Sequence, residues 1–230
     1  MNESEFDQFA DEYRRLHTAN IKASGMEPDF FAEYKVRDVA LRIDRLNLRS
    51  DTILDFGSGV GNSVPHFRRM MPHSILFCAD VSKKSLDFAE NRFPNQANFH
   101  HIQNGSLASI SQRFDIIFSA CVLHHIKHEE LVYWLKELRL LANPGATLAL
   151  FEHNPWNPLT IQAVNTCEFD INARLLSAPQ LKAMVRDAGW HDISSEFRIF
   201  FPGSLARLRP IERLLTWLPV GAQYVIYAKA

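Results

Sequence analysis

The sequence predicts an α/β protein in which helices cover both faces of a mostly parallel sheet and the last strand is antiparallel. From residue 50 onward, short apolar runs alternate with amphipathic helical patterns to the end of the 230 residues. The run "FDIIFSACVL" at 114–123 is apolar at almost every position, which is typical of a strand buried on both faces. No full helical pattern separates the last two strand-like runs, so we expect the final strand to be antiparallel.

Helical patterns also fill the N-terminal part of the chain. Apolar residues recur at helical spacing from Phe6 to Leu16 and from Phe30 to Leu46, and we predict a helical lid at 1–49. Residues 50–230 then form the main domain. Its strands are expected at 52–56, 74–80, 98–103, 114–123, 147–153, 193–201 and 222–230. Its helices are expected at 62–71, 82–93, 129–142 and 178–189.

Local signals place several helix ends. Ser82 suits an N-cap, and "NPGA" at 143–146 should stop the helix before it. Pro179 and Gly189 mark the start and the end of the helix at 178–189. Two connections are longer than these elements need, at about 153–178 and 203–220, and we predict that both cover the substrate.

Composition excludes several classes of function. Hydrophobic residues make up 47% of the chain and charged residues 22%, and the formal net charge is −1, so we expect no nucleic-acid partner. Three cysteines without close pairing indicate free thiols in a reducing compartment. No uncharged apolar run reaches the roughly 18 residues that cross a bilayer, and the acidic N-terminus lacks a signal-peptide layout. We therefore expect a cytoplasmic protein.

The stretch "ILDFGSGVG" at 53–61 ends a predicted strand with three glycines, Gly57, Gly59 and Gly61. Ligands of open α/β sheets bind beyond the carboxyl ends of the strands, and glycines let the backbone approach them closely. Asp80 ends the next strand, where its carboxylate can accept hydrogen bonds from the two hydroxyls of a ribose. A plain tight turn is the alternative. Asp55 would repel a pyrophosphate, but it suits a cationic ligand end such as an ammonium group.

Four segments in order resemble class I S-adenosylmethionine-dependent methyltransferases, in their small-molecule branch: "ILDFGSGVG", "FCADVSKKSL", "RFDIIFSACVLHHI" and "LLANPGATLALFEH". The resemblance covers about residues 35–195. It implies a Rossmann-like sheet of seven strands with the last one antiparallel. It also implies S-adenosylmethionine as the cofactor and S-adenosylhomocysteine as the product.

The resemblance further implies which residues bind the cofactor: Asp55, Phe56, Gly57, Ser58, Gly59, Gly61, Asp80, Val81, Asn104, Ser106, Ala120 and Tyr13. Many relatives carry an aspartate after the third strand for the adenine amino group. Here "QNGSLAS" offers Ser106 or Asn104 instead. Tyr34 is a second candidate to close over the cofactor, with ordinary core packing as the alternative.

Methyl transfer needs no metal, but a hydroxyl or carbon acceptor needs a base. His124 and His125 follow the fourth strand and His153 follows the fifth, so all three are candidate bases. A histidine there can instead pack on the cofactor or cap a helix. His124, His125 and His128 could also suggest a metal site, but no cysteine or carboxylate stands at ligand spacing, and we predict no metal.

The two long connections should select the acceptor. In the first, the expected substrate contacts are Asn154, Trp156, Asn157 and Arg174. In the second, leucines at helical spacing alternate with Arg207, Arg209 and Arg213. We favour a cover packed on the sheet, with a lipid-facing helix pair or a dimer contact as alternatives.

These patterns predict an enzyme that methylates a small molecule, with a lean toward a sugar or lipid-linked biosynthetic intermediate. Two other functions stay open. A nicotinamide-dependent dehydrogenase normally has the motif Gly-x-Gly-x-x-Gly, whose third glycine would stand one residue after Gly61, and such a function would not explain Asp55. A non-catalytic cofactor-binding protein could share the fold.

Overall fold

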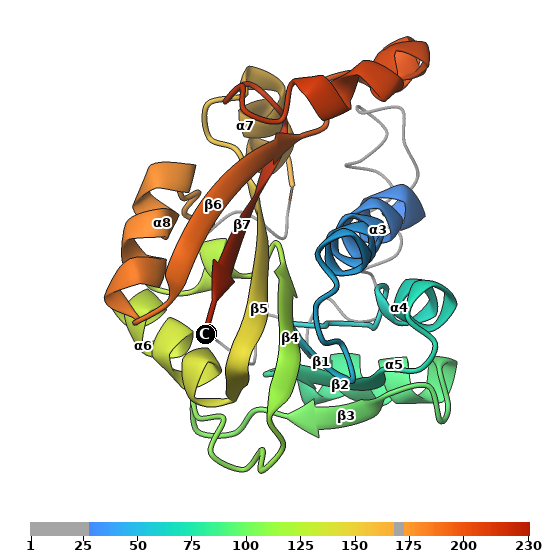
Figure 1. Cartoon of the computed structure of the whole chain (residues 1–230), viewed down its shortest axis with the longest axis vertical. Coiled ribbons are helices and arrows are strands. Elements are labelled where there is room, and N and C mark those ends of the chain that lie inside the picture. The colour runs from blue at the N-terminus through green and yellow to red at the C-terminus, as the bar shows by residue number, and fades with distance from the viewer. Residues whose placement is uncertain (1–27, 168–172) are drawn as a thin grey trace.

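Seven strands form one sheet in the order β3-β2-β1-β4-β5-β7-β6 (Figure 1). The structure, a computed structural model, describes residues 28–167 and 173–230. The strands are β1 Thr52–Phe56, β2 Ile75–Asp80, β3 Asn98–His101, β4 Phe114–Ala120, β5 Ala142–His153, β6 His191–Arg198 and β7 Gln223–Lys229. β7 pairs antiparallel with both β5 and β6, whereas the pairs among β1 to β5 are parallel. The predicted fold class is confirmed.

Helices pack on both faces of this sheet (Figure 1). On one face lie α3 (Pro28–Leu46) and α4 (Val64–Met70), which share a core with the β1 residue Ile53. On the other face lie α6 (His128–Leu140) and α8 (Ala178–Asp187), which share a core with Leu54 and Phe56. Consecutive residues of β1 therefore point into different cores, as the alternation of side chains along a strand requires.

The helix ends follow the expected signals. α5 (Lys83–Arg92) begins after Ser82, whose hydroxyl accepts the backbone N–H of Ser85 at 3.1 Å. α8 begins with a capping box between Ser177 and Gln180. Gly189 follows the end of α8 with φ +90°, a conformation that favours glycine.

Two elements differ from expectation. The "NPGA" stretch at 143–146 lies inside β5 rather than before it, because β5 pairs with β4 from Ala142 and shifts its register before Thr147. The long connection after β5 contains a helix, α7 (Pro158–Asn165). Asn157 caps it by accepting the backbone N–H of Thr160 at 3.0 Å, and Pro158 occupies the first turn.

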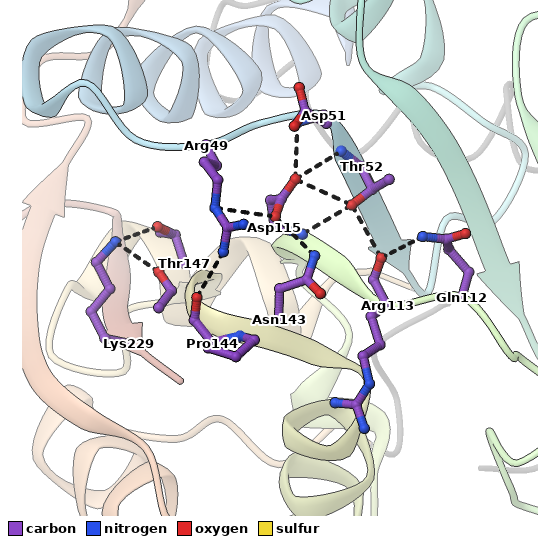
Figure 2. A network of polar contacts seen from close by, with 11 residues as sticks. Arg49, Asp51, Thr52, Gln112, Arg113, Asp115, Asn143, Pro144, Thr147 and Lys229 are labelled. Atoms are coloured by element: carbon purple, nitrogen blue, oxygen red, sulfur yellow. Dashed lines mark hydrogen bonds and ion pairs between the residues drawn. The ribbon is translucent and has the colours of Figure 1, made fainter.

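The amino ends of β1 and β4 are joined by a polar network around Asp115 (Figure 2). One carboxylate oxygen accepts the backbone N–H groups of Asp51 at 3.0 Å and Thr52 at 3.3 Å. The other accepts the amide of Asn143 at 2.9 Å. These bonds fix the register of the strands at the edge opposite to the glycine turn.

The connection between β6 and β7, residues 203–220, is here called the β6–β7 arm. Its first part is the 3-10 helical segment η4 (Gly203–Leu214), and none of that segment's side chains is buried. η4 thus shows no buried contact of the kind that a packed cover would make, and a substrate-covering role of residues 203–220 stays a prediction. No helix in the described part of the chain has the length and apolarity needed to cross a membrane.

The predicted division into a lid at 1–49 and a main domain stays a prediction. The helical pattern at 6–16 lies outside the described residues. α3 packs on the sheet, since Val36 and Val39 are fully buried in the core that contains Ile53.

Candidate functional site

The glycine turn follows β1 and lies against the ends of β2 and β4. Gly57 donates its N–H to the carbonyl of Ala79 at 2.8 Å and has φ +76°. A Cβ atom at Gly57 would lie 2.3 Å from a methyl carbon of Val122, so a side chain does not fit there. Gly59, at φ +51°, faces open space, which leaves room for a ligand against its backbone.

Asp80, at the end of β2, holds this turn in place. One carboxylate oxygen accepts the N–H of Gly59 at 2.8 Å and the other accepts the N–H of Ser82 at 2.8 Å. Burial raises the pKa of Asp80, and the N–H groups of Ser82 and Gly59 lower it without cancelling the rise. A carboxylate with spare acceptor positions beside an open glycine backbone suits the two hydroxyls of a ribose.

Asp55 is buried on the sheet side of the turn, where its carboxylate accepts a short hydrogen bond from the Ser63 hydroxyl. Burial raises the pKa of Asp55 to about 7, the bond from Ser63 lowers it, the charge of Asp80 raises it and that of Lys35 lowers it. A cationic group placed nearby would favour the ionised form. This environment fits the ammonium end of an amino-acid-like ligand.

The remaining predicted cofactor residues are distributed unevenly. Phe56 turns its ring away into the core, with its centroid 5.6 Å from that of Trp134, so only its backbone borders the turn. Asn104 is exposed in the bend after β3, and Ser106 there accepts the N–H of Ala108 at 3.1 Å. Ala120 ends β4. Four further candidates remain. Ser58 and Gly61 lie in the turn, Val81 directly follows β2, and Tyr13 lies outside the described residues.

The three candidate bases lie together beyond the carboxyl ends of β4 and β5. His124 donates from Nδ1 to a carboxylate oxygen of Glu152 at 2.6 Å, and both side chains are buried. The ring of His124 lies 4.2 Å from that of His125 and 5.2 Å from that of His153, between centroids. The structure thus brings all three histidines to one place.

Glu152 fixes this arrangement from the end of β5. Its second oxygen accepts the N–H groups of Val122 at 3.1 Å and Leu123 at 2.8 Å. Burial alone would raise the pKa of Glu152, but the charge and hydrogen bond of His124 outweigh burial and bring the pKa below its ordinary value. Glu152 therefore stays ionised and selects the His124 tautomer that carries its proton on Nδ1.

A second polar cluster, which the sequence analysis did not find, centres on Cys121. Its sulfur lies 3.2 Å from Nζ of Lys35 and 3.7 Å from Nε2 of Gln223. The backbone of Cys121 has φ +59°, which is uncommon for a residue with a side chain. Burial raises the pKa of Cys121, but the charges of His153 and Lys35 outweigh burial and bring it to about 6.

Tyr34 borders that cluster instead of closing over open space. Its side chain is buried, and its hydroxyl donates a short hydrogen bond to the Gln223 side chain. Its ring packs edge-on against Phe151 at 6.1 Å between centroids. The structure therefore shows Tyr34 packed in the core, which was the alternative to a position over the cofactor.

Of the predicted substrate contacts, two have structural roles. Asn154 is fully buried and donates to the carbonyls of Pro219 at 3.1 Å and Gly221 at 2.7 Å. Asn157 caps α7. Trp156 is half exposed and Arg174 is exposed, so both remain available to a substrate.

One group of possible metal ligands occurs among the described residues, away from the histidine cluster. Ligand atoms of Asp29, Glu33 and His66 lie within 4.8 Å of one another. Arg69 enters this group, 3.0 Å from Glu33 and 3.3 Å from His66. Arg69 pairs with Glu33, and His66 lies 3.0 Å from Asp29, so the group forms a polar network that joins α3 to α4.

Comparisons with known proteins agree with this geometry. Residues 54–148 match the model of a methyltransferase domain. A tRNA N(3)-methylcytidine methyltransferase of Schizosaccharomyces pombe is 28% identical over 109 residues, which are 44% of this chain and 44% of that protein. The chain thus matches less than half of that relative's length.

Solved structures share the fold over nearly the whole chain. A possible histamine N-methyltransferase of Thermotoga maritima is 17% identical with a TM-score of 0.66, over 99% of this chain and 98% of that one. The plantazolicin methyltransferase in complex with S-adenosylhomocysteine is 16% identical with a TM-score of 0.65, over 99% and 95%. Magnesium protoporphyrin IX methyltransferase of Synechocystis is 17% identical with a TM-score of 0.64, over 99% and 97%.

Proposed function

We propose that the chain is a class I S-adenosylmethionine-dependent methyltransferase and that it methylates a small molecule. The observation that carries the proposal is the Asp80 carboxylate beside the open backbone of Gly59. S-adenosylhomocysteine would be the product. We further propose a cytoplasmic enzyme, in keeping with three free cysteines.

Several residues would hold the cofactor. Asp80 would accept the ribose hydroxyls, and the turn at 57–61 would lie against the nucleoside. Asp55 would face the ammonium group, and the buried Lys35 would suit the carboxylate of the same amino-acid end. When bound, the cofactor supplies a methyl group on a positively charged sulfur.

The histidine cluster would prepare the acceptor. Because Glu152 holds the proton of His124 on Nδ1, the other ring nitrogen of the neutral imidazole can accept a proton. His153 is only partly buried and can meet an acceptor more directly than His124 can. We assign the base to one of these two, with His125 as the third candidate.

Calorimetry with S-adenosylhomocysteine tests the cofactor assignment. We expect saturable uptake by the full chain. No uptake at millimolar ligand by folded protein would refute the assignment, and uptake of a nicotinamide instead would favour the dehydrogenase.

The acceptor is tested with methyl-labelled S-adenosylmethionine and a fractionated cell extract. We expect label in the small-molecule or lipid fraction, and loss of that label in His124→Ala or His153→Ala. If both variants keep full transfer, neither histidine is the base.

A tRNA acceptor is the second candidate, favoured by the similarity to the fission-yeast tRNA methyltransferase. Against it stands the net charge of −1, since RNA binding normally draws on several Lys and Arg contacts to phosphate. Label confined to the RNA fraction would replace our proposal with this one. Cofactor uptake without label in any fraction would favour a non-catalytic binding protein.

A further inference from the structure

The β6–β7 arm presents large apolar side chains to solvent. Trp217 is 73% exposed and Leu214 66% exposed. The other exposed apolar residues of the arm are Leu205, Leu208, Ile211 and Val220. Soluble proteins rarely expose so contiguous an apolar stretch unless another surface covers it.

The acidic residue of the arm faces the body of the protein, whereas two of its arginines face solvent. Glu212 points back to the body, where one carboxylate oxygen accepts the N–H groups of Phe200 at 3.0 Å and Phe201 at 2.9 Å. Arg207 and Arg213 are exposed, and neither forms an ion pair with a residue that the structure describes. The solvent-facing side of the arm is therefore apolar and positive, although the whole chain carries a net charge of −1.

The arm is fixed to the body at two places. In its first half, the guanidinium of Arg209 lies 4.6 Å from the ring centroid of Phe30 on α3. At its end, Asn157 donates to the carbonyl of Val220 at 2.7 Å, and Asn154 donates to Pro219 and Gly221. These bonds reach the corner between β5 and α7, which directly follows His153.

The place of the arm links it to the candidate site. Figure 1 shows the arm beyond the same end of the sheet as α7, where β5 ends. Trp156 and Leu159 in this corner are also exposed, at 52% and 65%. One end of the molecule thus combines the histidine cluster with an apolar and basic surface.

We propose that the β6–β7 arm docks on an anionic lipid bilayer. Leucine and tryptophan side chains enter the boundary between headgroups and acyl chains, while Arg207 and Arg213 meet anionic headgroups. This mixture of exposed aromatic, aliphatic and arginine residues is typical of segments that lie in a membrane interface. The consequence for catalysis rests on the proposed methyl transfer, because docking would bring an amphiphilic, lipid-linked acceptor to the histidine cluster.

Flotation of the full chain with vesicles tests the docking. The probes are phosphatidylcholine vesicles with and without phosphatidylglycerol. We expect the protein to float with the anionic vesicles and to stay behind with the neutral ones. Arg213→Glu and Trp217→Ser should each lower the bound fraction about tenfold or more.

Two matched changes on α6 serve as controls, because they alter exposed residues of the same kind on another face. Lys136→Glu and Leu140→Ser should float as the wild type does. No flotation of the wild type, or equal flotation of all five proteins, would overturn the proposal. Self-association that Trp217→Ser abolishes, without any flotation, would also overturn it and assign the arm to a dimer contact.

The outcome is independent of the proposed function. Flotation without uptake of S-adenosylhomocysteine would keep the docking and refute the methyltransferase assignment. Uptake of S-adenosylhomocysteine without flotation would refute the docking and keep the methyltransferase assignment.

Discussion

Glu152 accepts the Nδ1–H of His124 at 2.6 Å, and both side chains are almost completely buried. The two residues stand at the carboxyl ends of neighbouring parallel strands. The same carboxylate holds two backbone N–H groups of the segment after β4. One acid therefore sets both the path of this segment and the tautomer of the histidine.

Replacing Glu152 by glutamine should disturb both the segment after β4 and the tautomer of His124. Glutamine can keep the two backbone bonds through its carbonyl, but its amide then faces the Nδ1–H of His124. We expect a loss of about 1–3 kcal/mol in the free energy of unfolding and a switch of the His124 tautomer. Urea unfolding and nitrogen NMR of the ring measure the two effects.

The stability difference between the wild type and Glu152→Gln depends on pH, because only the wild type carries the carboxyl with the lowered pKa. The carboxylate contributes stability above its unfolded pKa near 4.5, and that contribution is lost as pH falls through the lower, folded pKa. The stability difference between the wild type and Glu152→Gln should thus shrink on acidification below pH 4.5. Glu129→Gln, an exposed change on α6, should show no such trend.

Asp80→Asn should weaken the uptake of S-adenosylhomocysteine about 10- to 100-fold, because a charged acceptor is replaced by a neutral one. Acidification should weaken uptake by the wild type as well, since burial raises the pKa of Asp80 and protonation removes the charge. Calorimetry over a pH series measures both. Asp87→Asn on the exposed face of α5 is the control, and an affinity equal for both variants would contradict the ribose assignment.

Cys121 should react with iodoacetamide at neutral pH. Because the charges of His153 and Lys35 bring its pKa to about 6, the labelling rate should rise through a midpoint near pH 6. Cys78 should stay unlabelled in the folded protein, since it is buried and burial raises its pKa. Mass spectrometry of the peptides measures both rates. In His153→Ala the midpoint should move upward, and a midpoint near 9 in the wild type would contradict the proposed ion pairing.

Asp115→Ala should destabilise the fold by about 2–4 kcal/mol, because it leaves the N–H groups of Asp51 and Thr52 without their buried acceptor (Figure 2). Chemical unfolding measures the loss. Asp87→Ala removes an exposed pair with Lys83 and should change stability by no more than about 0.5 kcal/mol. Equal effects of the two changes would show that the network contributes little.

The strand pattern and the glycine turn could be predicted from sequence because both are local. All but the last residue of β4 are buried, as its apolar run predicts. The need for glycine at position 57 could not be predicted, because it depends on a contact with Val122, which follows another strand. The helix α7 was missed although Asn157 and Pro158 form an ordinary start signal.

Pairings across the sheet escaped the sequence analysis. His124 and Glu152 are 28 residues apart, and only the parallel pairing of β4 and β5 makes them neighbours. Lys35 and Cys121 are 86 residues apart and belong to different layers. Asn154 was expected to contact substrate, but its partners are backbone carbonyls that no pattern predicts.

Asp55 should reduce the stability of the ligand-free protein above neutral pH. In the unfolded chain it ionises near 3.8, whereas burial raises the pKa of the folded protein to about 7. Between pH 3.8 and 7 ionisation of Asp55 lowers the free energy of the unfolded state but not that of the folded state. The free energy of unfolding therefore falls as pH rises, and the loss levels off above pH 7 at about 4 kcal/mol. Asp55→Asn keeps an acceptor for Ser63 and removes the charge. We expect this variant to be more stable than the wild type at pH 8, nearly equal to it at pH 4, and weaker in its uptake of S-adenosylmethionine. Urea unfolding at the two pH values and calorimetry measure these differences. A variant that is less stable at pH 8 would show that the Asp55 carboxylate is already compensated within the fold.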